Sequence, residues 1–272
     1  MENEICFKNS KTILNKGTGF LTGYTHSLNP YTGCSFACSY CYVRQMPVSL
    51  FRKKEWGSWV DIKQNAAILL KKELKNAKNK GQVSIFMSSS TDPYQPIEQN
   101  ERVTRSLLEV MLQNPPDFLF VQTRSPLVKR DIDLLKQFKE KIRVSMTIET
   151  DLDEIRKYFS PYAPPIKARL KAIEKLREAG IPTQATIAPI LPSSEELPII
   201  LSKLVNRICI DDFFMGDGSG GKRTTRLDIK TKYKELGLEE WYGPEAYKFV
   251  YERFKNYFSE SQIFISQKGF ER

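Results

Sequence analysis

The sequence predicts an α/β fold in which a parallel sheet forms a barrel or an incomplete barrel. Short apolar segments of strand length alternate with longer amphipathic segments through most of the 272 residues. This alternation predicts repeated βα units whose strands run parallel. About six such units follow one another with few interruptions, which favours one barrel-like domain over two lobes.

The predicted strands are short apolar runs bounded by turn-forming residues. In chain order they cover residues 25–30, 83–87, 118–122, 142–148, 183–190 and 207–211. A last strand is expected at residues 263–265. It lies within a C-terminal stretch, from about residue 227, that is otherwise predicted to be helical.

Helices are predicted where apolar residues recur at helical spacing between these strands. They cover residues 61–76, 100–113, 131–138, 165–179 and 194–205. Asp61 is a suitable N-cap for the first helix. Gly180 follows the fourth helix and is typical of the residue at which a helix ends.

The composition is that of an ordinary globular domain, with 40% hydrophobic and 27% charged residues. The sequence has no apolar run of about 18 residues, the length a membrane span needs. Residues 1–4 lack the basic-then-apolar order of a signal peptide. We therefore expect no membrane partner and a cytoplasmic location, where unpaired thiols persist.

The net charge of +10 permits a nucleic-acid or other phosphate-rich substrate. The basic residues are spread along predicted helices, however, and such runs are more often solvated helix faces. A basic-aromatic stretch at residues 51–59 contains Trp56 and Trp59. Core packing of these two rings is favoured over stacking on nucleobases.

Three cysteines form a C-x3-C-x2-C pattern just after the first predicted strand: Cys34, Cys38 and Cys41. Thiolates are the usual protein ligands of iron–sulfur clusters. Three of them bind three irons of a [4Fe–4S] cluster and leave the fourth iron open to a small molecule. The pattern therefore predicts a metal site on these three residues and a reactive cluster.

Other readings of the cysteines are less favoured but stay open. A structural zinc site takes four ligands. The other cysteines, Cys6 and Cys209, lie far away in the sequence, and the only histidine is His26. An odd number of clustered cysteines does not fit a disulfide framework. A non-catalytic iron–sulfur protein, either an electron carrier or a nucleic-acid-binding module, is the alternative from another functional class. A carrier normally uses four cysteines.

Residues of types that often form binding sites follow most of the predicted strands, at the point where each strand ends. They lie at residues 88–92, 123–125, 149–150, 188–190 and 211–212. In parallel sheets and barrels, ligands bind at the carboxyl ends of the strands. We therefore expect these residues to share one site with the cysteine loop.

A glycine-rich stretch at residues 216–222 fits the beginning of a phosphate-binding loop. Arg223 stands where that loop needs a serine or threonine for Mg²⁺, and no apolar helix follows. The stretch is therefore predicted to be a flexible loop over the active-site mouth. Lys222, Arg223 and Arg226 are its candidate phosphate contacts.

Taken together, these residues resemble the radical S-adenosylmethionine (SAM) superfamily. Within it, the sequence is similar to the branch that includes spore photoproduct lyase and its DNA repair photolyase-like relatives. The resemblance covers about residues 20–215. It rests on residues 29–42, 91–98, 104–105, 123–126 and 169–181.

The resemblance implies a partial (β/α)6 TIM-type barrel of the radical SAM type. It also implies two cofactors, a [4Fe–4S] cluster and SAM, which chelates the open iron. One electron then cleaves SAM to methionine and a 5′-deoxyadenosyl radical, which takes a hydrogen atom from the substrate. A flavodoxin- or ferredoxin-like protein is the expected electron donor. The substrate is not identified, and a nucleic acid remains among the options.

The resemblance also implies which residues bind SAM. They are Tyr40, Thr91, Arg124, Ser145, Ala188 and Pro189. Tyr40, Ala188 and Pro189 would contact the adenine, and Thr91 would hold the methionyl amino group. Arg124 and Ser145 would hold the carboxylate and the ribose, since the forked donors of arginine suit a carboxylate.

The predicted domains are an N-terminal extension (1–24), the radical SAM core barrel (25–215), and a C-terminal loop and helical extension (216–272). One feature departs from spore photoproduct lyase, in which a cysteine after the second strand donates a hydrogen atom. Here the matching run begins with Ser89, whose O–H bond is too strong for that role. A lyase-like enzyme with another substrate is therefore favoured, and spore photoproduct lyase-like DNA repair stays an alternative.

Overall fold

The computed structural model describes residues 4–272 and confirms the predicted fold class, an α/β fold with a mostly parallel sheet. Residues 1–3 lie outside the described residues. They begin the predicted N-terminal extension and belong to the residues 1–4 that lack the pattern of a signal peptide. No helix in the described part of the chain has both the length and the apolar character to cross a membrane.

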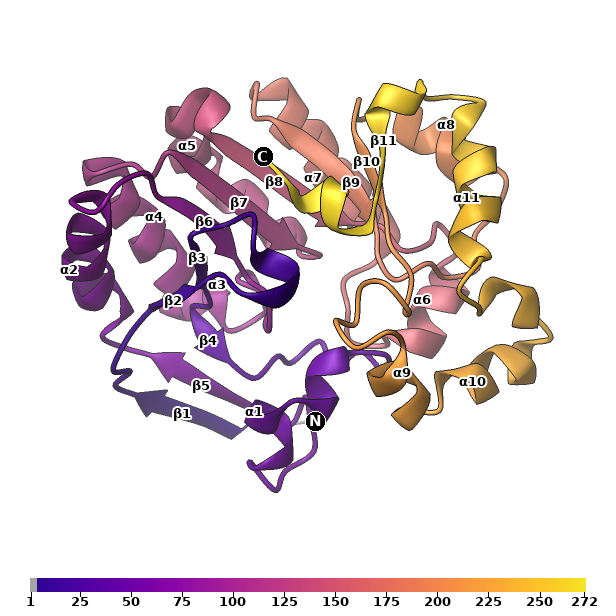
Figure 1. Cartoon of the computed structure of the whole chain (residues 1–272), viewed down its shortest axis with the longest axis horizontal. Helices are drawn as coiled ribbons and strands as arrows, with labels where there is room; N and C mark the ends of the chain where they lie inside the picture. The colour runs from indigo at the N-terminus through magenta and orange to yellow at the C-terminus, as the bar shows by residue number, and fades with distance from the viewer. Residues whose placement is uncertain (1–3) are drawn as a thin grey trace.

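The main sheet has eight strands in the order β11-β10-β9-β8-β7-β6-β3-β2 (Figure 1). Their bounds are β2 Leu14–Lys16, β3 His26–Leu28, β6 Ser84–Met87, β7 Phe118–Thr123, β8 Ile142–Thr147, β9 Thr183–Ile187, β10 Ile208–Ile210 and β11 Ile263–Ile265. Every neighbouring pair is parallel except β2 with β3. In the described residues β2 and β11 are the two edges of the sheet, so the barrel is partial.

Six of these strands, β3 and β6 to β10, are the six predicted from the sequence. Five are shorter than predicted, and β7 is one residue longer. The last predicted strand, residues 263–265, is β11. The helices of the βα units cover one face of the curved sheet (Figure 1). The helices of this chain are α1 Pro47–Leu50, α2 Ala66–Lys78, α3 Glu98–Glu101, α4 Val103–Gln113, α5 Ile132–Leu135, α6 Asp153–Phe159, α7 Ile166–Glu178, α8 Glu196–Ser202, α9 Lys222–Arg226, α10 Ile229–Leu236 and α11 Ala246–Lys255.

A second, three-stranded sheet corrects one prediction. It consists of β1 Glu4–Lys8, β5 Trp59–Lys63 and β4 Tyr31–Thr32, with β5 in the centre. The helix expected from residue 61 therefore begins only at Ala66. Asp61 does not cap it, because its carboxylate lies on β5 and accepts hydrogen bonds from Lys8 and Arg52. The pairing of β1 with β5 joins distant parts of the chain, which local spacing does not reveal.

Two more predicted helices are interrupted. Arg102 has a left-handed backbone (φ 51°) and separates α3 from α4 within the segment 100–113. The segment 131–138 contains only the short α5 between 3₁₀ turns. The prediction for α7 is confirmed to within a residue or so at each end, and Gly180 follows it with φ 71°.

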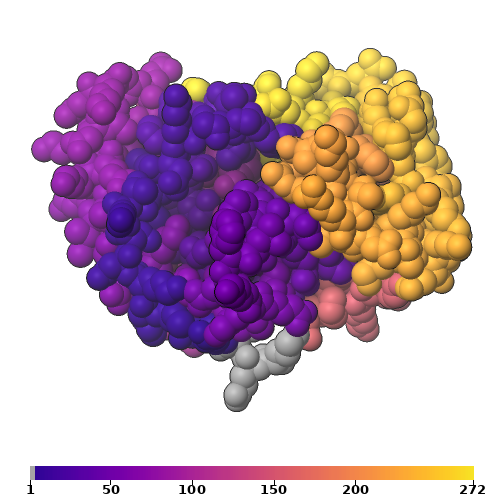
Figure 2. Space-filling view, turned by 60° about the horizontal axis from the view of Figure 1, so that its bottom comes forward, coloured from indigo at the N-terminus to yellow at the C-terminus, as the bar shows by residue number. Residues whose placement is uncertain are grey.

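The C-terminal segment returns to the region of the cysteine loop. Helix α9 packs against the 3₁₀ turn Tyr42–Gln45 that follows the third cysteine. In the space-filling view the orange residues of this segment lie beside the purple residues around α1 (Figure 2). The chain after β10 therefore forms part of the surface around the open end of the sheet.

Candidate active site

A cavity of about 550 Å³ lies at the carboxyl ends of the parallel strands. All three cysteines of the C-x3-C-x2-C pattern line it. Most of the residues that follow the strands also meet there: Ser88, Ser89, Ser90, Thr91, Asp92, Thr123, Arg124, Ala188, Pro189, Asp211 and Asp212. Four residues of the expected set do not line the cavity: Ser125, Glu149, Thr150 and Ile190. The structure therefore brings the expected strand ends and the cysteine loop to one site.

The cysteine loop is held in place by the protein alone. Gly33 has φ 88°, and a Cβ there would lie 2.4 Å from the carbonyl oxygen of Trp59, so only glycine fits this close approach. The guanidinium of Arg44 donates to the carbonyl oxygens of Cys38 (2.9 Å) and Ala37 (2.8 Å). Trp56 and Trp59 are buried against the loop, as expected for core packing.

The three thiols form no disulfide. Burial raises the pKa of Cys41 to about 11 and also raises the pKa of Cys34. Buried thiols of this kind become thiolates when a metal replaces their protons. Cys6 and Cys209 do not line this cavity, so the pattern supplies three ligands and not four.

In the described residues, no group of three His, Cys, Asp or Glu side chains is close enough to bind a single metal ion. The ligands of a cluster are bound to different irons and stand farther apart than the ligands of one ion. Three free thiols on one cavity wall therefore fit a [4Fe–4S] cluster better than a zinc ion.

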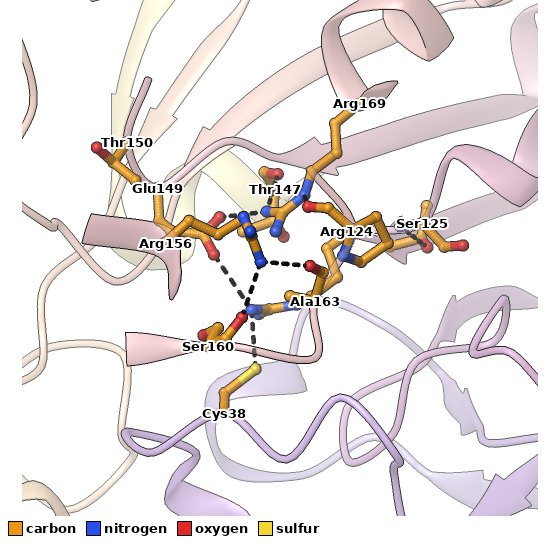
Figure 3. Close-up of polar contacts among 12 residues, drawn as sticks. Cys38, Arg124, Ser125, Thr147, Glu149, Thr150, Arg156, Ser160, Ala163 and Arg169 are labelled. Carbon is orange, nitrogen blue, oxygen red and sulfur yellow. Dashed lines mark hydrogen bonds and ion pairs between the residues drawn. The ribbon is translucent and has the colours of Figure 1, made fainter. Parts of the chain in front are cut away.

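Arg124 connects the cysteine loop to the sheet (Figure 3). It follows β7, and its Nη1 donates to the sulfur of Cys38 (3.0 Å) and to the hydroxyl of Tyr40 (2.7 Å). The same nitrogen lies 3.4 Å from Oε1 of Glu149. A planar guanidinium held in this way has further donors available for a carboxylate in the cavity.

Glu149 is fully buried behind this contact and forms a 2.7 Å ion pair with Arg169, which is also fully buried (Figure 3). Burial alone would raise the pKa of Glu149, but the charges of Arg169 and Arg124 outweigh it and lower the pKa. Arg169 also donates to the carbonyl oxygen of Thr147. A continuous chain of contacts thus runs from Cys38 through Arg124 and Glu149 to α7.

The loop after β6 is tied to the cysteine loop from the other side. Thr91 donates its hydroxyl to the carbonyl oxygen of Gly33 (2.6 Å), and Gln95 accepts from the backbone N–H of Ser35 (2.9 Å). Asp92 accepts from the hydroxyl of Thr123 (2.7 Å) and from the backbone N–H of Arg124 (2.8 Å). These contacts fix Thr91 and Arg124 relative to the three thiols.

Ser145 is the one predicted SAM-binding residue that does not line the cavity. It is fully buried on β8, and its hydroxyl contacts Thr186 and accepts a hydrogen bond from Gln184 (3.1 Å). The predicted contact with ribose stays a prediction. Ala188 and Pro189 line the cavity, as does Tyr40.

A second wall of the cavity, the β10 wall, is formed by β10 and the glycine-rich loop. Asp211 and Asp212 follow β10 directly, and both line the cavity. A Cβ at Gly216 would lie 2.3 Å from Oδ2 of Asp211, so this glycine gives the carboxyl group its room. Asp217 accepts hydrogen bonds from the backbone N–H groups of Gly221 (3.0 Å) and of other loop residues. These hydrogen bonds fix the conformation of the loop.

Several cavity residues were not singled out from the sequence. Some belong to the segment before the core barrel and one to the C-terminus: Lys16, Phe20, Leu21, Gln122, Thr147 and Phe270. Their side chains reach the cavity through long-range packing, such as the hydrogen bond from Tyr24 to the carbonyl oxygen of Phe270 (2.5 Å). No local sequence signal marks them.

Comparisons with known proteins agree with this geometry. The family model described as "Radical SAM superfamily" matches residues 28–204. An uncharacterized protein of Methanocaldococcus jannaschii is 33% identical over 252 residues, covering 91% of this chain and 88% of that protein. An uncharacterized protein of Acidianus two-tailed virus is also 33% identical, over 74% of this chain and 70% of its own length.

Solved structures show the same fold. A mutant of spore photoproduct lyase with bound AdoMet and dinucleoside spore photoproduct has a TM-score of 0.67 at 18% identity, covering 96% of this chain and 81% of that chain. Streptococcus suis SuiB, bound to S-adenosylmethionine, has a TM-score of 0.51 at 14% identity, covering 78% and 44%. At these identities the likeness concerns the fold.

Proposed function

Since this chain belongs to the radical SAM superfamily and is therefore an enzyme, we propose that Cys34, Cys38 and Cys41 bind a [4Fe–4S] cluster in the cavity. Cluster binding and SAM cleavage are general to that superfamily. Bound together, the two cofactors would supply a 5′-deoxyadenosyl radical for hydrogen abstraction from a substrate. A flavodoxin- or ferredoxin-like protein is the proposed source of the electron.

One observation carries the proposal. Three unpaired thiols from one loop line the same cavity as the polar ends of the parallel strands. A parallel sheet binds its ligands at this edge, and the donor set is that of a three-ligand cluster. A zinc site or a four-cysteine carrier lacks a ligand here.

The chain's own residues bind and orient SAM in this proposal. Arg124 holds the methionyl carboxylate with donors that remain after its contact with Tyr40. Thr91, fixed by the carbonyl oxygen of Gly33, lies near the amino group. Ala188, Pro189 and the buried Tyr40 ring would enclose the adenine. Residues that are buried or half-buried in this way would limit the access of water to a bound radical.

Spore photoproduct lyase activity itself is not proposed. Ser89 lines the cavity at the position where that enzyme has a hydrogen-donating cysteine, and its hydroxyl accepts from Asn29 (3.2 Å). A hydroxyl does not donate a hydrogen atom to a carbon radical as a thiol does. The proposed enzyme therefore needs another hydrogen donor, and its substrate differs.

The test begins with anaerobic reconstitution with iron and sulfide. We expect about four irons per chain by the three-cysteine pattern, and a change in the magnetic resonance spectrum of the reduced protein when SAM is added. Dithionite should then release 5′-deoxyadenosine. The proposal is refuted if the iron spectrum of the reconstituted protein does not change when SAM is added. The variant Arg124→Lys should weaken the spectral change that SAM causes, which checks that the change arises in this cavity.

A further inference from the structure

We propose that Asp211 and Asp212 form a subsite for a cationic nitrogen of the substrate, an ammonium or guanidinium group. The inference names the substrate class of the proposed active site, so it rests on the proposed function. It arises from two side chains for which the predicted cofactor contacts do not account. The fold itself uses Oδ1 of Asp212, which accepts hydrogen bonds from the backbone N–H groups of Phe214 and Met215 (2.7 Å each).

Both carboxyl groups are buried without a compensating charge. Asp211 and Asp212 are each 4% exposed. Within residues 4–272, Oδ1 of Asp211 and Oδ2 of Asp212 have no hydrogen-bond donor, and neither side chain has an ion-pair partner. Buried charges in proteins are normally paired or bound to a metal. The missing partner is therefore a group that enters the cavity from outside.

Asp211 and Asp212 belong to the same cavity as the cysteines. Both residues line it, on the wall formed by β10 and the loop after it. The third carboxylate of this wall, Asp217, is fully used by backbone N–H groups and by the hydroxyl of Ser219. The nearby cation Arg223 donates to the carbonyl oxygen of Asp217 and not to either free carboxyl group. Two acceptors thus remain for a ligand.

An organic cation fits this pair better than an inorganic one. Calcium and magnesium require about six oxygen ligands, whereas no group of three acidic, Cys or His side chains in the described chain converges on one point. A guanidinium or ammonium group needs only two or three acceptors and gains charge-assisted hydrogen bonds. Carboxylates from two consecutive residues meet that need.

The position separates this subsite from the SAM contacts. The residues proposed for SAM belong to the cysteine loop and to the ends of β6, β7 and β9, whereas Asp211 and Asp212 follow β10. A substrate bound by this pair would occupy the cavity that the three cysteines line. The proposed partner of the SAM amino group is Thr91, so that group does not need the acidic pair.

The experiment uses matched probes with the anaerobically reconstituted protein, saturated with SAM and without reductant. Propylguanidinium, propylurea and butyrate have nearly the same size but are cationic, neutral and anionic. We expect saturation-transfer NMR to show binding of propylguanidinium alone. Equal binding of propylurea would overturn the inference. So would binding of propylguanidinium that is present before SAM is added and absent from the SAM-saturated protein, because SAM itself would then occupy the pair.

Variants locate the binding. Asp211→Asn and Asp212→Asn should each weaken propylguanidinium binding about tenfold, the effect of losing a hydrogen bond to a charged group. Asp228→Asn, an exposed carboxylate of the same segment that does not line the cavity, should have no effect. Unchanged binding in the double variant Asp211→Asn/Asp212→Asn would refute the subsite. The comparison of the three probes with the unmodified protein does not depend on the folding of any variant.

The pH dependence gives an independent readout. Burial raises the pKa of Asp211 to about 8 and also raises the pKa of Asp212. Because a cation binds the deprotonated pair, affinity for propylguanidinium should rise as pH rises through about 8. The other titratable or charged groups facing the pair are Cys209, Tyr42, Asp217, Arg223 and Glu245. Burial raises the pKa of Cys209 and Tyr42, so neither gains charge near neutral pH.

The two proposals fail separately. Release of 5′-deoxyadenosine by the same preparation after addition of dithionite tests the proposed function. If SAM is cleaved but propylguanidinium does not bind, only the subsite is refuted. If propylguanidinium binds but the iron spectrum ignores SAM, the cation site stands and the proposed function is refuted.

Discussion

The two walls of the cavity differ in the hydrogen bonds that they give to a buried carboxyl group. On the wall next to the cysteines, Asp92 accepts hydrogen bonds from Thr123 and from the backbone N–H groups of Tyr94 and Arg124. On the β10 wall, one oxygen of Asp211 has no donor among the described residues. The fold by itself satisfies the carboxyl group on the first wall, which we call the completed wall, whereas on the second wall it leaves an oxygen without a donor for a ligand to satisfy.

The completed wall is held in one arrangement by contacts within the protein. Arg124, Glu149 and Arg169 are linked by ion pairs, and Arg44 fixes the carbonyl groups of the cysteine loop. Such positioning groups must be set before a cofactor arrives. The β10 wall keeps a buried carboxyl group that lacks a donor, which is a cost in stability that natural proteins accept at functional sites.

The largest expected effect tests whether the cysteines on the completed wall bind the metal cluster. Cys38→Ala should abolish the [4Fe–4S] absorption, because two thiolates do not hold the cluster, and should abolish SAM cleavage with it. Iron and sulfide content after reconstitution measure the loss. Cys6→Ala, on β1 and outside the cavity, is the matched control and should retain the full cluster. A normal cluster spectrum in the Cys38 variant would contradict the ligand assignment.

The next effect concerns the rigidity of that wall. Glu149→Ala leaves Arg169 buried without a partner and should lower the free energy of unfolding by about 3–5 kcal/mol. Urea denaturation measures it. Glu178→Ala removes an exposed ion pair with Lys175 at the end of α7 and should cost less than about 1 kcal/mol. Equal effects of the two variants would mean that the buried pair adds no rigidity.

Asparagine substitutions should change stability in opposite directions on the two walls. Asp92→Asn replaces an acceptor that serves three donors and should destabilise by about 1–3 kcal/mol. Asp211→Asn should stabilise the ligand-free protein at pH 8 by about 1–3 kcal/mol, because it removes a buried charge.

The sign for Asp211 follows from its pKa. The folded state raises this pKa to about 8, so the folded protein binds more protons than the unfolded chain at lower pH. Stability from this group is therefore lost as pH rises from about 4 toward 8. The gain in Asp211→Asn should vanish near pH 4. Thermal unfolding at both pH values measures it, and an equal gain at pH 4 would exclude ionisation as the cause.

The smallest expected effect concerns Ser145, the predicted residue that the structure places outside the cavity. Its contacts with Thr186 and Gln184 predict that Ser145→Ala costs about 1 kcal/mol of stability and leaves SAM affinity within about twofold. Equilibrium titration of SAM decides the question. A tenfold loss of affinity would support the ribose contact predicted from the sequence.

The sequence was sufficient for the parts of the molecule that depend on local pattern. The six parallel strands follow from short apolar runs, and the shared site follows because parallel strands end at the same edge. The cysteine spacing predicted three thiols that now line one cavity. These inferences need only neighbours in sequence and the geometry of a parallel sheet.

Other parts depend on contacts between distant segments and were missed for that reason. The pairing of β1 with β5 makes residue 61 part of a strand, although the local spacing favours a helix. Lys16 and Phe270 reach the cavity from opposite ends of the chain. The ion pair of Glu149 with Arg169 joins residues 149 and 169 across a strand end and a helix.

Gly216 shows how a familiar pattern can have another cause. The glycine-rich run invites comparison with nucleotide-binding loops, yet its first member is required by the close approach of the Asp211 carboxyl group. A methyl group at this position would push the acid sideways and close the recess in front of it. Glycine is thus needed here because a side chain would clash with the carboxyl group of Asp211. Any homologue that carries a bulkier residue here should accept a differently shaped or uncharged substrate.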